Sequence, residues 1–65
     1  MVYDFRETMI AQCHYPIKIG ESVLVKDNHD GIDFIGKIIG RDKDTIRVSL
    51  PYSREFICSF VFRFW

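Results

Sequence analysis

Cys13 and His14 are the first neighbouring side chains whose types could do chemistry, because a thiol activated by an imidazole is a nucleophile. On a helix, however, adjacent residues point about 100° apart, so this pair does not make a thiolate–imidazole dyad. Neither Cys13 nor Cys58 is flanked by turn residues, and the chain lacks the dense cysteine framework of small secreted scaffolds. We therefore interpret both as buried free thiols; a disulfide and a metal-binding role are the alternatives.

A second candidate is His29, which lies between the carboxylates of Asp27 and Asp30. One histidine and two carboxylates lack the ligand spacing of a structural zinc site. They fall in the turn cluster Asn-His-Asp-Gly, so we interpret them as the solvated tip of a hairpin. The sequence also has no glycine-rich phosphate loop, paired-carboxylate cleft or serine elbow. We expect no enzyme activity, no catalytic residues, no cofactor and no metal.

Basic and aromatic side chains offer a different chemistry, the binding of single-stranded RNA. Arg41, Lys43 and Arg47 surround one turn and Tyr52 follows them, so that cations and a ring for base stacking come together. Nine basic and nine acidic side chains cancel over the whole chain, and no strong field draws it onto a polyanion. RNA binding through these four residues is our alternative hypothesis.

The aromatic run near the C-terminus, REFICSFVFRFW, favours a protein partner. Trp, Phe and Arg are enriched in protein interfaces. Alternation places Val61, Arg63 and Trp65 on the face opposite the phenylalanines, which we assign to the core. We predict that these three residues bind a protein, either a heterologous partner or a second copy in a homodimer. Zero net charge and an unpaired edge on this terminal strand favour self-association.

The elements that must position these surfaces are mainly strands. β-branched and aromatic residues cluster into four runs separated by turn signals, and alternation predicts strands within 20–27, 32–42, 45–50 and 54–65. Gly36, inside the second run, fits a sharp bend or a close backbone crossing such as the corner of a small barrel. Gly40 is expected to end that strand. In the third run, Ile46, Val48 and Leu50 point inward and Thr45, Arg47 and Ser49 outward.

The first segment, 3–16, predicts a short helix. Asp4 is a candidate N-cap with Glu7 three positions later, which is the spacing of a capping box. Phe5 and Met9 then fall on one helical face. The competing interpretation is a strand, in which the charged Glu7 interrupts the alternating apolar face.

A chain of 65 residues forms a single domain, 1–65, and domains of this size bury only about 60% of the surface of the unfolded chain. We predict a mainly β fold, a small antiparallel barrel of four to five strands with a short N-terminal helix. The first residues have no apolar run behind basic ones, so we expect neither a secretion signal nor a membrane span. Free thiols favour the reducing cytoplasm.

The segment 20–50 resembles the core of the small-barrel superfold shared by Src-homology-3-like, Sm-like and Tudor-like domains, over about half the chain. The positions that resemble the first Sm motif are Gly20, Val23, Val25, Gly31, Phe34, Gly36, Ile38 and Asp42. Where Sm-like proteins place a base-contacting asparagine, this chain has Ile46. Gly20-Glu21-Ser22 and the strand before Pro51 are similar to the carbon storage regulator family. A Tudor-like aromatic cage would use Phe34, Tyr52 and Phe56, which we interpret as core aromatics.

Together these observations predict a non-enzymatic protein-binding module, such as a small adaptor or an inhibitor of the kind that phages encode. The alternative is an RNA-binding regulator of the Sm-like or carbon-storage-regulator type. Recognition of a modified peptide in a Tudor-like cage is a third hypothesis. No small-molecule substrate is expected, because a barrel of this size has no interior room for one, and no membrane partner is expected.

Overall fold

The structure, a computed structural model, describes residues 2–29, 31–50 and 54–63. Those residues form six strands. In chain order the strands are Val2–Asp4 (β1), Met9–Cys13 (β2), Ser22–Asp27 (β3), Asp33–Arg41 (β4), Thr45–Leu50 (β5) and Arg54–Phe62 (β6). In this part of the chain there is no helix, and so none that is long and apolar enough to cross a membrane.

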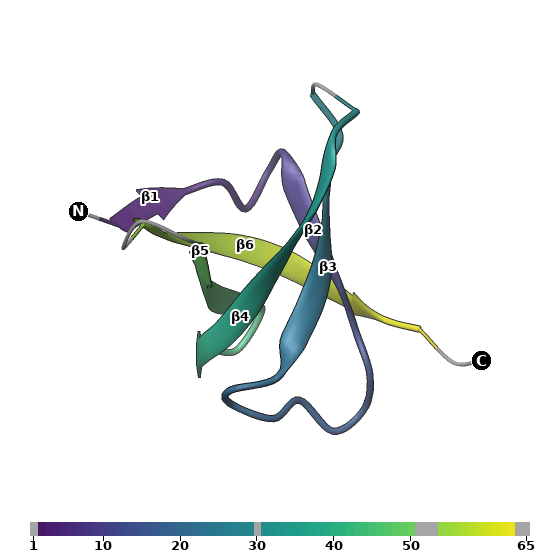
Figure 1. Cartoon of the computed structure of the whole chain (residues 1–65), viewed down its shortest axis with the longest axis vertical. Coiled ribbons are helices and arrows are strands. Elements are labelled where there is room, and N and C mark those ends of the chain that lie inside the picture. Colours follow the sequence, from purple (N-terminus) through teal and green to yellow (C-terminus); the bar gives the residue numbers. More distant parts are fainter. Residues whose placement is uncertain (1, 30, 51–53, 64–65) are drawn as a thin grey trace.

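Five of the strands close into a barrel (Figure 1). β2, β3, β4 and β5 pair in chain order, each antiparallel to the next. β6 completes the ring, because it is antiparallel to β5 on one side and parallel to β2 on the other. β1 is an additional strand that also lies parallel to β6. The resemblance to the small-barrel superfold is thus confirmed at the level of the fold.

β4 is bent, and it takes part in both halves of the barrel. Its residues 33–37 pair with β3, and its residues 37–41 pair with β5. At Gly36 an added Cβ would collide with Cγ1 of Val48 and lie 3.1 Å from the carbonyl oxygen of Ser49. The predicted close backbone crossing at Gly36 is therefore confirmed. The prediction that Gly40 ends the strand is wrong, because β4 continues through a bulge to Arg41.

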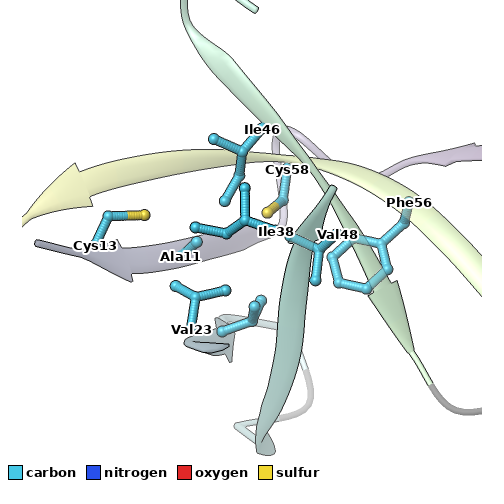
Figure 2. Packing of buried hydrophobic residues seen from close by; sticks show 9 residues of the cluster. Ala11, Cys13, Val23, Ile38, Ile46, Val48, Phe56 and Cys58 are labelled. Atoms are coloured by element: carbon cyan, nitrogen blue, oxygen red, sulfur yellow. The ribbon is translucent and has the colours of Figure 1, made fainter. Parts of the chain in front are cut away.

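The core is made by the inward faces of the five barrel strands (Figure 2). Its buried apolar members are Ala11, Cys13, Val23, Val25, Ile38, Ile46, Val48, Phe56 and Cys58. The inward face predicted for β5 is confirmed by Ile46 and Val48, and Leu50 packs half-buried against the core. Of the phenylalanines of β6 assigned to the core, Phe56 is buried, and Phe60 and Phe62 pack against the core half-buried. Phe64 lies outside the described residues. One outward prediction is wrong, since Thr45 is only 8% exposed.

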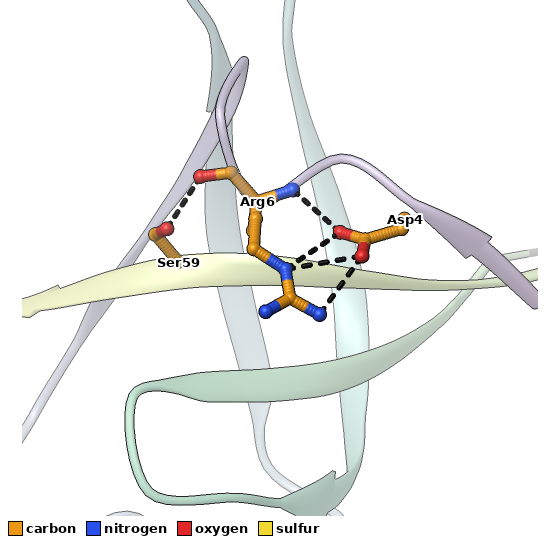
Figure 3. Close-up of polar contacts among 3 residues, drawn as sticks. All are labelled: Asp4, Arg6 and Ser59. Atoms are coloured by element: carbon orange, nitrogen blue, oxygen red, sulfur yellow. Dashed lines mark hydrogen bonds and ion pairs between the residues drawn. The ribbon is translucent and has the colours of Figure 1, made fainter.

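The N-terminal segment forms two short strands and a turn in place of the predicted helix. In that turn the carbonyl oxygen of Phe5 accepts hydrogen bonds from the N–H groups of Thr8, at 3.1 Å, and Met9, at 2.9 Å. Asp4 caps it, because its Oδ1 accepts from the N–H of Arg6 at 3.1 Å (Figure 3). The capping signal is therefore real but serves one turn only. β6 offers both flanking segments a ladder of hydrogen bonds, and this tertiary pairing outweighs local helix propensity.

This turn is attached to the barrel through β6. The hydroxyl of Ser59 donates a hydrogen bond to the carbonyl oxygen of Arg6, and the Arg6 guanidinium forms an ion pair with Asp4 at 2.8 Å (Figure 3). Hydrogen bonds from Arg6 hold the pKa of the Asp4 carboxyl below its usual value. Both side chains are exposed, so the pair itself adds little to stability.

β6 has the most neighbours of any strand. β5 pairs with its residues 54–59, β1 with 55–57 and β2 with 59–62. The prediction that this strand leaves an unpaired edge is therefore wrong for most of its length. Barrel closure uses both edges of β6, which removes the edge from which we expected self-association.

Candidate functional site

An exposed apolar row crosses the outside of the barrel. The strand register places Val61 beside Gln12, Gln12 beside Leu24, and Leu24 beside Ile35. Directly paired residues point to the same face of a sheet, so these four side chains form one line across β6, β2, β3 and β4. Val61, Leu24 and Ile35 are 44%, 37% and 66% exposed. We call these four residues the outer row.

The neighbours of the outer row along β3 and β4 are polar, whereas on β2 the outward Ile10 is apolar and half-buried. Along β3 and β4 the other outward positions are Ser22, Lys26, Asp33 and Lys37, and all four are exposed. The residues that alternate with the outer row along each strand point inward and form the core. The outer row is therefore a separate apolar feature on the outside of the barrel. An apolar centre inside a polar rim is the usual composition of a protein interface.

The predicted protein-binding residues have three different outcomes. Val61 lies in the outer row. Arg63 follows β6; its side chain is exposed and its N–H donates to the carbonyl oxygen of Cys13 at 2.9 Å. Trp65 lies outside the described residues. Leu24 and Ile35 were missed as site residues.

Two of the four predicted RNA-binding residues come together. Arg41 and Arg47 line a depression of about 290 Å³ between β4, β5 and β6. Both guanidinium groups already have neighbours, since Arg41 lies 5.7 Å from the ring centroid of Phe60 and Arg47 forms an ion pair with Glu55 at 3.8 Å. The depression also contains the acidic Asp42, which reduces its positive charge.

Of the other two RNA candidates, the structure describes only Lys43. Lys43 is exposed in the β4–β5 turn, where its N–H donates to Oδ1 of Asp42 at 2.8 Å, and it is not part of the lining. Tyr52 lies outside the described residues. Among the described residues, the depression therefore brings together the two predicted arginines, Arg41 and Arg47.

A second concave site opens at one mouth of the barrel, next to β1. It has a volume of about 410 Å³ and is lined by Tyr3, Phe5, Met9, Phe34, Leu50, Arg54 and Phe56. We call it the aromatic pocket. Phe34 and Phe56 were the two described members of the imagined Tudor-like cage, and their ring centroids are 5.7 Å apart. Within the described residues no carboxylate lines this pocket and the positively charged Arg54 does, which disfavours binding of a methylated ammonium there.

The cysteines are both buried free thiols, as predicted. Burial raises the pKa of the Cys58 thiol to about 12, and it also raises the pKa of Cys13. The thiolate is the reactive form of cysteine, so both thiols are held in the unreactive protonated form at neutral pH.

The hairpin between β3 and β4 is closed by Asp27. Its Oδ1 accepts from the N–H of His29 at 2.9 Å, and its carbonyl oxygen accepts from the N–H of Gly31 at 2.8 Å. Asp30 lies outside the described residues. Across 2–29, 31–50 and 54–63, no three His, Cys, Asp or Glu side chains lie close enough together to hold a metal ion.

Alkaline pH is expected to destabilise the fold through Cys58. Its pKa is 9.0 in the unfolded chain and about 12 in the fold, so this thiol's contribution is complete below pH 9.0 and is lost as the pH rises towards 12. Replacing Cys58 with alanine should therefore flatten the alkaline fall in the free energy of unfolding. Urea denaturation of both proteins, from neutral pH to about pH 11, measures it. The same alkaline slope in both proteins would contradict this assignment.

Comparison with known proteins found no match to this chain among models of protein families, among curated proteins or among solved structures. The candidate sites therefore rest on the geometry of the chain itself.

Proposed function

We propose that the chain is a non-enzymatic protein-binding module that recognises its partner through the outer row. The observation that carries this proposal is the exposure of Ile35, at 66%, directly beside the exposed Leu24 on β3 and in the same row as the exposed Val61 on β6. Isolated exposed apolar residues are ordinary on protein surfaces. Three of them in one row, on β6, β3 and β4, with polar neighbours along β3 and β4, have the composition of an interface centre.

The outer row can supply useful binding energy. Fully burying an exposed Val, Leu or Ile side chain stabilises by about 1.5–3 kcal/mol, and Ile35 has the largest remaining exposed fraction of the three. Rim charges change affinity less than a desolvated anchor does. We therefore expect Ile35 to be the anchor of the interface, with Leu24 and Val61 beside it.

This chemistry suits a small adaptor, or an inhibitor such as phages encode, acting on a heterologous partner. A homodimer is the self-paired version of the same proposal, because a twofold axis through the outer row would bring two copies of it together. Buried free thiols are compatible with a reducing compartment, and we propose the cytoplasm.

Replacing Ile35 with serine is expected to weaken partner capture by about thirty-fold, which corresponds to the loss of a hot-spot anchor. The matched control is Lys37→Ser, since Lys37 is also exposed and outward on β4. The immobilised proteins are incubated with nuclease-treated lysate, and the captured proteins are quantified by mass spectrometry. Light scattering of the same variants measures self-association.

Equal capture by the Ile35 and Lys37 variants, with matching melting temperatures and unchanged self-association, would contradict the proposal. RNA binding is the second candidate, and the observation that favours it is the shared depression of Arg41 and Arg47. For an RNA partner, nuclease treatment should remove the captured material and Arg47→Glu should have a larger effect than Ile35→Ser. Affinity should then fall steeply with salt concentration.

A further inference from the structure

β1 has a free edge. The N–H of Phe5 donates to the carbonyl oxygen of Ile57 at 2.8 Å. Because main-chain groups alternate in direction along a strand, those of Tyr3 and Phe5 face β6 and those of Val2 and Asp4 face away from it. All three residues of β1 are exposed. Within the described part of the chain, no strand pairs with this outward edge.

The free edge borders the aromatic pocket. Tyr3 lies opposite Phe56 in the register, and both line the pocket. The rings of Tyr3 and Phe5 stack at 6.0 Å, and Phe56 meets Phe5 edge-on at 6.0 Å. A strand added beside β1 would therefore place every second side chain above these rings.

Arg54 gives the pocket its charge. It lies two residues before Phe56 on the same face of β6, and it is the one charged side chain in the described lining. The nearest acidic residue in sequence, Glu55, points to the other face and is paired with Arg47. No ion pair of Arg54 is found within 2–29, 31–50 and 54–63. A carboxylate is the ligand group that suits this guanidinium.

We propose that the free edge of β1 and the aromatic pocket together bind an extended segment of a partner protein, which places an apolar side chain in the pocket and a carboxylate on Arg54. The inference rests on the proposed function, because it assumes a protein partner, and it names the chemistry of one recognised segment. It does not depend on the outer row. Strand addition of this kind takes affinity from main-chain hydrogen bonds and specificity from pockets for alternate side chains.

The strand register sets the spacing in that segment. On an added strand, the residue beside Tyr3 would point into the pocket, because Tyr3 lies opposite Phe56. Arg54 lies two residues before Phe56 on β6, so the added strand reaches the level of Arg54 two residues farther along in that direction. Side chains on one face of a strand recur every second residue. The recognised segment therefore has an apolar residue and an acidic residue separated by one position, in the order Leu-x-Glu or Glu-x-Leu according to its direction.

The test uses blocked pentapeptides and the full chain. One peptide has leucine at its second position and glutamate at its fourth, a second has the reverse order, and threonine fills the other positions. Titration is followed by NMR at the backbone amides of residues 2–5, 34 and 54–57. We expect saturable shifts there with one of the two orders, and about ten-fold weaker binding when lysine replaces the glutamate.

A second test reverses the charge of Arg54 and compares the peptide that contains glutamate with the peptide that contains lysine. Arg54→Glu should weaken binding of the glutamate peptide about ten-fold and strengthen binding of the lysine peptide. Lys43→Glu is the matched control, because it makes the same charge change on an exposed residue at the other end of β5. It should leave both affinities unchanged.

Two results would overturn the inference. One is the absence of saturable shifts with both peptide orders, and the other is an equal response of the Arg54 and Lys43 variants. If the peptides fail while capture from lysate still depends on Ile35, the proposed function stands and this segment chemistry is wrong. If the peptides bind while the Ile35 variant captures normally, strand addition stands and the outer row is not the interface.

Discussion

Gly36→Ala is expected to lower the free energy of unfolding by roughly 2–3 kcal/mol, at the upper end of the cost of overpacking a core. The new Cβ would overlap Cγ1 of Val48 and press on the carbonyl oxygen of Ser49. Val48 is fully buried, so its methyl has no free space to move into. β5 cannot shift either, because it pairs with β4 on one side and β6 on the other. The effect is steric, since the φ angle of Gly36 is not in the left-handed region.

Gly40→Ala is the matched control for this prediction. Its added Cβ would meet the Cβ of Arg47 at 3.5 Å, which is ordinary van der Waals contact. We expect a change within about 0.5 kcal/mol, because loss of glycine's freedom in the unfolded chain favours the fold. Urea denaturation of both variants measures the difference. Equal destabilisation by the two substitutions would show that the crossing at Gly36 is looser than described.

Truncating Phe56 to alanine should have the largest effect on stability, a loss of about 3–5 kcal/mol. Phe56 is 2% exposed, and its ring packs edge-on against Phe34 at 5.7 Å and Phe5 at 6.0 Å. Chains of this length have a total stability of roughly 3–10 kcal/mol on the usual per-residue scale. We therefore expect a Phe56→Ala chain that is largely unfolded at 37 °C, as measured by circular dichroism and amide dispersion in NMR spectra.

The control for Phe56 is Phe60→Ala, on the same strand. Phe60 is half-buried and contacts Phe62 and the Arg41 guanidinium near the other end of β6. Its truncation removes less buried surface and should leave a folded protein with a lower melting temperature. A Phe60→Ala chain as unfolded as Phe56→Ala would mean that the core extends farther along β6 than the burial indicates.

The barrel could be predicted from the sequence because its strands have a clear period of two. Ile46 and Val48 were assigned to the inward face from alternation alone, and both are buried. Gly36 was identified as a crossing because a glycine inside an apolar strand needs a packing reason. These signals are local, so one sequence contains them.

The errors lie where distant segments meet. The segment 3–16 carries helix signals, but its pairing with β6 depends on residues near the other end of the chain. Thr45 is polar at an outward position, yet it lies beside Ser59, which holds the N-terminal turn against the outside of the barrel. Neither arrangement has a local sequence signal.

Prediction of the candidate sites was limited in the same way, because contacts between distant segments have no local sequence signal. Val61 was selected for its position on the outward face of its strand, and the structure places it in the outer row. Its alignment with Leu24 depends on the parallel register between β6 and β2, which alternation cannot supply. Tyr3 and Phe5 were assigned to a helix, so the aromatic pocket that they form with Phe34 was missed.

The position of β6 in the chain order has a consequence for biosynthesis. β2 and β5 each keep one unpaired edge until Arg54–Phe62 leaves the ribosome, because only β6 joins them. Before β6 is added, the strands β2 to β5 can form only an open sheet with two unpaired edges, which is prone to aggregation. Closure then depends on contacts between residues at opposite ends of the chain, such as Ala11 and Phe60. Such a high contact order favours folding in milliseconds to seconds over the microseconds typical of helical domains.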